Sequence, residues 1–136
     1  LRHITFNSRL IPNEKSGTYP REVSSKNQFL TYALKIREDI SYKAPVWDDK
    51  KQVYYRFSYQ YIFDENALPK ENQLFPRPIG ATVYLSVLDK DFNLVAEGAV
   101  PQLDRTPSFH FVKDGKLWLF ENIEDEMGFV RLDINW

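Results

Sequence analysis

Most of the chain alternates between short apolar runs and polar turn residues, a pattern typical of β-strands. The strongest run covers residues 53–62 (VYYRFSYQYI), which is aromatic and β-branched and contains neither Gly nor Pro. The same pattern predicts further strands at residues 2–11, 42–47, 81–88, 94–100, 108–112, 116–120 and 128–136. Residues 64–80 contain three prolines and are predicted to be a surface loop.

One segment has the periodicity of a helix. Apolar side chains recur at steps of three and four residues from Phe29 to Ile40, and Ser24 and Ser25 precede them as candidate N-caps. We therefore expect one helix near residues 25–40, which would cover an edge or a face of a sheet.

Polar turns join the predicted strands into hairpins. Residues 48–51 (DDKK) separate two strands, and residues 89–93 separate two others. Asp114-Gly115 gives the clearest hairpin, because this dipeptide suits a tight turn with positive φ angles. The acidic residues 121–126 are predicted to form a loop before the last strand.

The hairpins repeat within the chain. Residues 46–55 and 110–119 both consist of an apolar strand, a charged turn and an apolar or aromatic strand. Val53 and Leu117 correspond in this alignment, 64 residues apart (117 − 53). Each unit has a third strand, but only the first unit has a fourth, at residues 94–100.

Repeated antiparallel units of three or four strands are typical of β-propeller blades, which bury their faces by stacking on one another. We therefore expect a mainly β, antiparallel fold that resembles two blades, the second incomplete. Residues 1–40 would form a strand, a loop and a helix, residues 41–100 the first unit, and residues 101–136 the second.

We also expect the chain to be a processed or truncated piece of a longer propeller. It begins at Leu1 rather than Met, and two blades cannot close a ring. The fourth strand that the second unit lacks would then come from the other end of the longer chain. Alternatively, the strand at residues 2–11 is the last strand of a preceding blade. An alternative is a self-contained β domain that assembles by pairing its open strand edges.

Three runs carry a family resemblance: residues 44–57 (APVWDDKKQVYYRF), 85–95 (LSVLDKDFNLV) and 111–119 (FVKDGKLWL). They resemble the C-terminal part of an uncharacterised propeller-like family, typically lipoproteins of Bacteroidetes bacteria that carry a domain of unknown function. The similarity covers most of residues 40–136. It implies an extracytoplasmic location (periplasm or cell surface) and a binding or scaffolding role, and it supplies no catalytic residues.

Composition excludes several classes of function. Eighteen basic and nineteen acidic residues give a net charge of −1 without a dominant basic patch, which argues against a nucleic-acid partner. The absence of cysteine excludes disulfides, thiol nucleophiles and thiolate metal sites. No apolar run reaches the roughly 20 residues of a membrane-spanning helix.

Acidic and histidine residues offer only weak candidates for chemistry. Asp89, Asp91 and Asn93 have the spacing at the start of a calcium loop, but Leu94 and Val100 replace the required Gly and Glu. We interpret this segment as a polar turn. A second acidic cluster consists of Glu121, Glu124, Asp125 and Glu126. Two carboxylate pairs could serve glycoside hydrolysis, namely Asp48-Asp49 and Asp64-Glu65. The histidines are His3 and His110. We expect no metal, no cofactor and no intrinsic catalysis from them.

Aromatic side chains form the most specific candidate for binding. The aromatic share is 15%, and Trp47, Tyr55, Arg56, Tyr59 and Tyr61 lie within fifteen residues (61 − 47 + 1). The period of two places Tyr55, Tyr59 and Tyr61 on one face and Arg56 on the other. Such residues can stack on a glycan or a peptide, but we favour packing between blades as the interpretation of this cluster. We expect Trp118 and Trp136 to lie in the core.

The function favoured by these patterns is a binding or scaffolding module of an extracytoplasmic propeller protein. Its partners would be the remaining blades of a longer chain or other copies of itself. The alternative is a fragment of a carbohydrate-active enzyme with most of its catalytic residues elsewhere, which would require a cleft with two converging carboxylates.

Overall fold

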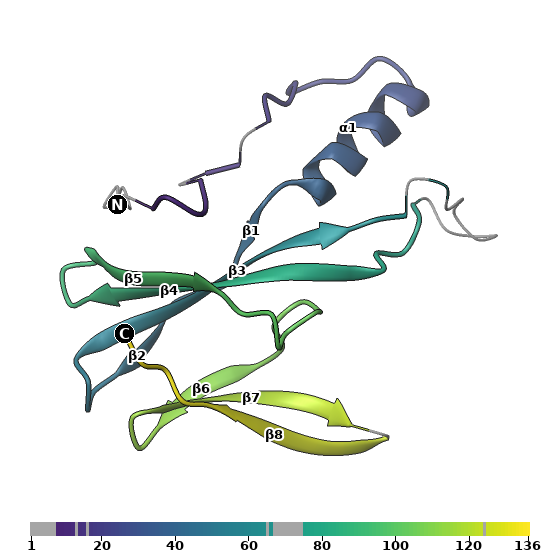
Figure 1. The fold of residues 1–136 in the computed structure, drawn as a ribbon. Helices are drawn as coiled ribbons and strands as arrows, with labels where there is room; N and C mark the ends of the chain where they lie inside the picture. Colours follow the sequence, from purple (N-terminus) through teal and green to yellow (C-terminus); the bar gives the residue numbers. More distant parts are fainter. Residues whose placement is uncertain (1–7, 13, 16, 65, 67–74, 124) are drawn as a thin grey trace.

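The computed structural model describes residues 8–12, 14, 15, 17–64, 66, 75–123 and 125–136. The described chain is mainly β, with two antiparallel sheets and one helix (Figure 1). The predictions for residues 1–7 and for most of the 64–80 loop lie outside the described residues.

The first sheet contains five strands. In chain order they are β1 (Ser41–Tyr42), β2 (Val46–Asp48), β3 (Val53–Ile62), β4 (Gly80–Asp89) and β5 (Leu94–Ala99). β3, β4 and β5 pair in sequence order, while β1 and β2 both pair with the other edge of β3. The predicted strand at residues 42–47 is thus split in two. The Lys43 N–H still donates to the Phe57 carbonyl on β3 at 2.9 Å, but Pro45 has no N–H to donate and interrupts the ladder.

The second sheet contains three strands in sequence order, β6 (His110–Lys113), β7 (Lys116–Ile123) and β8 (Glu126–Leu132). The acidic loop is shorter than the predicted residues 121–126. Ile123 pairs with Glu126, so only residues 124 and 125 lie between the strands. Pairing of β7 with β8 thus outweighs the low strand propensity of these acidic residues.

The two hairpins have the same register. Val46 pairs with Tyr55 in the first, and His110 pairs with Leu119 in the second, so both strands are shifted by 64 residues (110 − 46 and 119 − 55). A third strand follows in both units, and β5 has no counterpart among the described residues of the second. The structure thus confirms the repeat predicted from the sequence.

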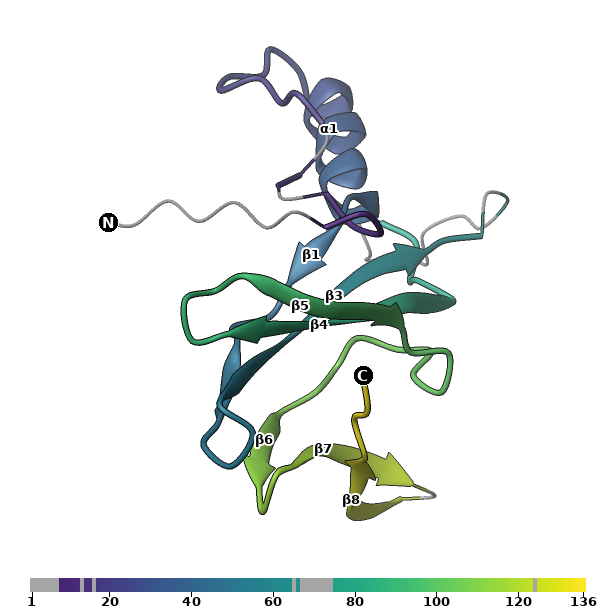
Figure 2. The ribbon, with the colours of Figure 1, turned by 60° about the vertical axis from the view of Figure 1, so that its left-hand side comes forward.

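The sheets pack face to face around one core (Figures 1 and 2). Phe57, Leu117 and Leu119 are fully buried, and Tyr55 is 1% exposed. The core includes further side chains from β3, β4 and the 101–107 connection: Val53, Ala81, Val83, Leu85, Val87 and Leu103. We call the sheet faces that meet in this core the inner faces.

Helix α1 (Lys26–Glu38) begins where the sequence predicts. The Ser25 side chain caps it by accepting a hydrogen bond from the backbone N–H of Gln28 at 3.1 Å. None of its residues is buried, and Figure 1 shows it beside the end of β3 rather than over a sheet face. Its contact with the sheet includes a hydrogen bond from Gln60 Nε2 to the Glu38 carbonyl.

Residues 8–11 do not form the predicted strand. The backbone N–H groups of Arg9 and Leu10 donate to the Glu97 carboxylate on β5, and that of Ile11 donates to Ser8 Oγ. Four residues further on from Ser8, the Pro12 carbonyl accepts a hydrogen bond from the Tyr42 hydroxyl on β1. Residues 8–12 therefore cross the outer face of the first sheet from one edge to the other.

The turn between β6 and β7 depends on glycine. Asp114 and Gly115 have φ angles of +54° and +72°, as expected for a two-residue hairpin turn. We predict that Gly115→Ala lowers the free energy of unfolding by about 1–2 kcal/mol, because a side chain disfavours this backbone conformation. Urea denaturation measures the change.

Gly128→Ala is the matched control for that substitution. Gly128 lies in β8 with nothing within 4 Å of an added Cβ. The variant should match the unsubstituted protein or exceed it in stability. Equal losses at the two positions would contradict the role assigned to the turn.

Candidate functional site

The five residues predicted to form a binding strip lie on two faces of the first sheet. Tyr55, Tyr59 and Tyr61 point to the inner face, where Tyr55 is buried and the rings of Tyr59 and Tyr61 are 5.4 Å apart. Trp47 and Arg56 point to the outer face. The structure does not gather the five on one surface, and their role in binding stays a prediction.

Tyr55 has a structural partner in Asp48. The buried Asp48 carboxylate accepts hydrogen bonds from the Tyr55 hydroxyl at 3.0 Å and from the backbone N–H groups of Lys50 and Lys51 at 3.0 and 3.1 Å. Burial, and then the hydrogen bond to Asp48, raise the pKa of Tyr55 well above its usual value. Asp48 thus holds the β2–β3 turn and is not a member of an exposed carboxylate pair.

Arg56 is 8% exposed, and its guanidinium lies 4.9 Å from the centre of the Tyr42 ring. Burial lowers the pKa of Arg56, because it disfavours the charged form. Arg56 is opposite Ser86 on β4, and Ser86 is opposite Glu97 on β5. This polar row lies on the outer face that residues 8–12 cross.

An exposed aromatic surface lies on the outer face of the second sheet. Leu117 and Leu119 point inward, so the alternating side chains of β7 point away from the first sheet. Register places Phe111 opposite Trp118, and Phe120 opposite Phe129. We call this surface the aromatic face; it consists of Phe109, Phe111, Trp118, Phe120 and Phe129.

The rings of the aromatic face contact one another. Phe111 stacks on Trp118 at 6.4 Å, and its ring centre lies 5.5 Å from that of Phe129. Phe109 and Phe129 are 70% and 53% exposed, and the neighbouring Met127 is 78% exposed. A contiguous exposed patch of this kind marks an interaction surface.

Sequence reasoning missed this face. Trp118 was expected in the core, but it points outward, and Trp136 is 54% exposed with Lys51 Nζ 5.5 Å from its ring centre. The sequence did indicate a shared face, because Phe109 and Phe111 are two residues apart, as are Trp118 and Phe120. Alternation predicts two faces of a strand, but it does not say which of two apolar faces is covered.

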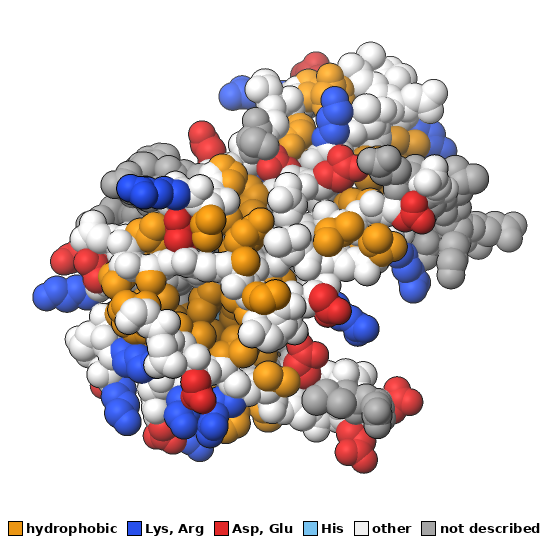
Figure 3. Space-filling view, in the orientation of Figure 1, with side chains coloured by type: hydrophobic (Ala, Val, Ile, Leu, Met, Phe, Trp, Pro, Cys, Tyr) orange, Lys and Arg blue, Asp and Glu red, His pale blue; other side chains and the backbone are white. Residues whose placement is uncertain are grey.

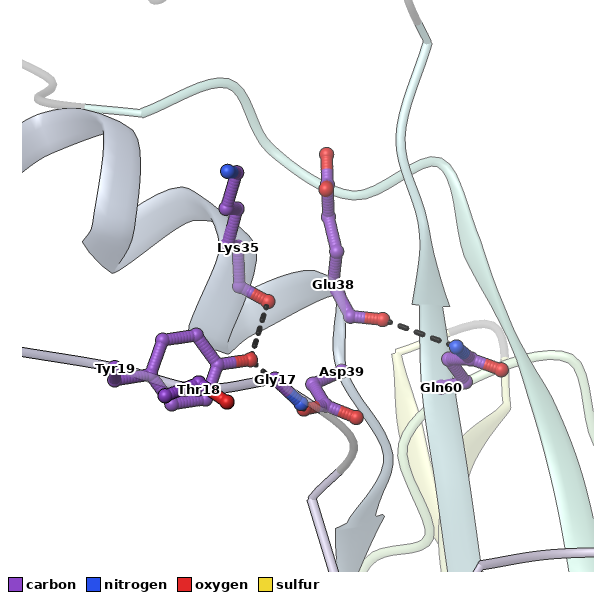
Figure 4. Close-up of a pocket in the computed structure, with 7 residues that line it drawn as sticks. All are labelled: Gly17, Thr18, Tyr19, Lys35, Glu38, Asp39 and Gln60. Carbon is purple, nitrogen blue, oxygen red and sulfur yellow. Dashed lines mark hydrogen bonds between the residues drawn. The ribbon is translucent and has the colours of Figure 1, made fainter.

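A polar pocket of about 330 Å³ lies at the C-terminal end of α1 (Figure 4). The Asp39 carboxylate accepts hydrogen bonds from the Tyr19 hydroxyl at 2.8 Å and from the Gly17 backbone N–H at 3.1 Å. The hydrogen bond to Asp39 raises the pKa of Tyr19. These contacts tie residues 17–19 to the end of the helix, so the polar groups of this pocket have a structural role.

A second hollow, of about 420 Å³, lies between the 101–107 connection and strands β7 and β8. Its lining includes Asp104, Arg105 and Glu121. The side chains of Asp104 and Arg105 are 4.0 Å apart and are 88% and 86% exposed. Leu103 and Val130 supply apolar walls. In Figure 3 charged side chains are visible beside the notch between the two sheets.

The segment with the calcium-loop spacing is a self-contained turn. The Asp89 carboxylate accepts hydrogen bonds from the backbone N–H groups of Asp91 and Asn93, both at 2.9 Å, and from Asn93 Nδ2 at 3.1 Å. These bonds, chiefly the one from the Asn93 backbone, lower the pKa of Asp89. Over the described part of the chain, no group of three or more His, Asp or Glu side chains is placed to hold a metal ion.

The other candidate groups are dispersed. His110 faces the core, where its ring meets Phe57 edge-on at 5.0 Å and its Nδ1 donates to the Ser108 carbonyl at 2.9 Å. The His110 side chain therefore lies on the opposite face of β6 from that of Phe111. His3, Glu65 and Glu124 lie outside the described residues.

A comparison with protein families shows to which family the chain belongs. Residues 1–99 match the model of a domain of unknown function, DUF4221. The chain belongs to the DUF4221 family. No curated protein and no solved structure matches it.

The DUF4221 match agrees with the expected domain of unknown function, and it overlaps the region of the resemblance over residues 40–99. The sequence resemblance was placed over most of residues 40–136, whereas the match includes the N-terminal segment and ends with β5.

The helices that the structure describes include none that is long and apolar enough to cross a membrane.

We predict that Asp48→Ala lowers the free energy of unfolding by about 2–3 kcal/mol, because it leaves the buried Tyr55 hydroxyl and two turn amides without an acceptor. Chemical denaturation followed by tryptophan fluorescence measures the loss. Asp49→Ala changes an exposed neighbour and should stay within about 0.5 kcal/mol of the parent protein. A small effect at Asp48 would show that the carboxylate does not hold the turn.

The lowered pKa of Asp89 predicts that its contribution to the stability of the fold depends on pH. Its pKa is lowered in the folded state from the usual 3.8, so its stabilising contribution is present above about pH 4 and is lost as the pH falls through the folded-state pKa. The stability difference between the parent protein and Asp89→Ala should therefore shrink between pH 7 and pH 2.5. Asp91→Ala, in the same turn, is the control; a pH-independent difference at Asp89 would refute the assignment.

Proposed function

We propose that this chain is a binding and scaffolding module of an extracytoplasmic β-propeller protein, and that it works by packing sheet on sheet. The proposal is supported by the blade-like order of each sheet and by the apolar core between them. β2 and β6 contact each other and run in the same direction in Figures 1 and 2. Successive propeller blades have this relation between their first strands.

The observation that carries the proposal is the aromatic face. The inner face of the first sheet, with Tyr55 and Phe57, is covered by Leu117 and Leu119 of the second. The outer face of the second sheet is as apolar, and no described residue covers Phe109 or Phe129. A sheet with two apolar faces is typical of a blade between two neighbours.

The extracytoplasmic location and the bacterial source of the protein are also part of this proposal. Both rest on the resemblance of residues 44–57, 85–95 and 111–119 to Bacteroidetes lipoproteins. The partner of the aromatic face is a further apolar sheet, with a glycan or an extended peptide as the competing ligand.

A second candidate function is favoured by the hollow that contains Asp104 and Glu121. Two carboxylates in one depression are the minimum that glycoside hydrolysis requires. A carbohydrate-active role predicts hydrolysis of aryl glycosides that is lost in both Asp104→Asn and Glu121→Gln. The scaffolding role predicts no such activity in the parent protein.

The scaffolding role is tested at the aromatic face itself. We expect the parent protein to bind an apolar fluorescent dye, and the double variant Phe109→Thr/Phe129→Thr to bind it at least fivefold more weakly, since threonine keeps the strand propensity but removes the apolar area. Ile79→Thr is the control, because Ile79 is 69% exposed but lies outside the face. Equal loss in both variants, or no loss in the double variant, would contradict the proposal.

A further inference from the structure

The second sheet has an open edge at β8, which pairs only with β7 among the described strands. The backbone N–H of Phe120 donates to the Phe109 carbonyl and therefore points toward β6. Phe129 lies opposite Phe120 in the register, so its N–H and C=O point away from β7. Those of Met127 and Arg131 point the same way, because the direction alternates along a strand. No described residue forms a backbone hydrogen bond with this row, which can pair with a further strand.

The first sheet carries a further strand at the corresponding edge. β6, β7 and β8 follow one another in the second sheet as β2, β3 and β4 do in the first, and β2 contacts β6. In the first sheet, β5 pairs with the edge of β4 that corresponds to the open edge of β8. On this side of the molecule, the first sheet therefore has one strand more than the second.

A hollow of about 520 Å³ lies against β5. Ala96 and Gly98 of β5 line it together with residues 133–136, and no described residue of β6, β7 or β8 does. The strand β5 therefore extends beyond the strands of the second sheet. Gln102 borders this hollow and also the hollow of about 420 Å³ beside Val130 of β8. Two neighbouring hollows thus lie on the inner side of the open edge, where a strand paired with β8 would place alternate side chains.

The residues directly after β8 do not lead back along its edge. After β4, the turn at residues 90–93 returns the chain as β5. After β8, the chain instead approaches the first sheet, where the Ile134 carbonyl accepts a hydrogen bond from Lys51 Nζ at 3.0 Å and the Ile134 side chain packs against the core. A strand that pairs with the open edge is therefore not joined to β8 by a hairpin turn.

A second copy of the chain does not fit this position. If two copies paired through their β8 strands about a twofold axis, both first sheets would lie on the same side of the joined second sheets. Because β2 contacts β6 and β5 extends beyond β8, the β5 strand of each copy would overlap β4 of the other. The position accepts a single strand with no second sheet attached to it.

We infer that the open edge of β8 binds one extended segment of another polypeptide, which pairs antiparallel with Met127, Phe129 and Arg131 and points alternate apolar side chains into the two hollows. The inference rests on the proposed function, since it names the strand that completes the second sheet of the scaffold. β-Branched apolar residues suit the inward positions, because they favour strands and would lie beside Ala96 and Val130.

A peptide of about eight residues, with alternating valine and threonine and a lysine at each end, tests the inference against the whole chain. Directly paired residues have side chains on the same face, and Phe129 belongs to the aromatic face, so inward valines place the threonine amides against β8. Fluorescence anisotropy of the labelled peptide should show saturable binding. N-methylation of the threonines should weaken binding at least about tenfold, because it removes the hydrogen bonds to β8.

N-methylation of the valines is the matched control, because their amides point away from β8. It should change the dissociation constant by less than about threefold. Absence of binding at about 1 mM peptide, equal losses in the two methylated peptides, or the reverse order of losses overturns the inference.

Amide hydrogen exchange locates the bound strand. Saturating peptide should slow the exchange of the Met127, Phe129 and Arg131 amides by about tenfold or more, since each gains an acceptor. Binding that leaves these three amides unprotected overturns the inference.

The open edge of β5 is the control within the same molecule. The Val100 N–H donates to the Val83 carbonyl, so the amides of Glu97 and Ala99 point away from β4. Their exchange should not change when the peptide binds. Protection of these two amides in place of those on β8 would assign the peptide to the wrong edge and overturn the inference.

Sedimentation of the chain without peptide tests the exclusion of a second copy. The chain should sediment as a monomer. A dimer in which the β8 amides are already protected would show that a second copy occupies the edge, and it would overturn the inference.

Dye binding separates this inference from the proposed function. A protein that binds the apolar dye at its aromatic face but does not bind the peptide refutes the strand partner and leaves the sheet-packing role intact. A protein that binds the peptide but not the dye contradicts the role of the aromatic face and leaves β8 as a strand acceptor.

Discussion

The structure depends on the contact between the inner faces of its two sheets. Phe57 from β3 and Leu117 and Leu119 from β7 are completely removed from solvent. Burial of each such side chain is worth roughly 1.5–3 kcal/mol. The second sheet has three strands, and a sheet this small needs a buried hydrophobic face to be stable. It is therefore stable because its inner face covers that of the first sheet.

Polar contacts fix the geometry around this core. Asp48 fastens the β2–β3 turn, Asp89 fastens the β4–β5 turn, and Glu97 holds the N-terminal segment on the outer face of the first sheet. Each carboxylate accepts backbone N–H groups that no strand partner uses. Asp48 and Asp89 thus serve their own turns and Glu97 serves a contact distant in the sequence, and among the described residues no group of acidic side chains is placed to hold a metal ion.

Strands, turns and the repeat could be predicted from the sequence because each depends on local patterns. The run at residues 53–62 became β3, and Asp114-Gly115 became a turn with positive φ angles. What sequence could not decide is which apolar face is covered, because that depends on contacts between distant segments. Tyr55 was a candidate for binding and is buried, while Trp118 was expected in the core and lies on the aromatic face. Residues 8–11 do not form the predicted strand, because their backbone binds the carboxylate of Glu97, which is distant in the sequence.

The central claim is that both sheets form one cooperative unit through the inner faces, so that the second sheet can present its aromatic face to a partner. Native-state amide hydrogen exchange tests this claim most directly. Our account predicts that the amides of Phe57 on β3 and Leu119 on β7 exchange with the same free energy of opening and the same dependence on denaturant. Exchange of β6, β7 and β8 at a much lower free energy than β3 and β4 would contradict it.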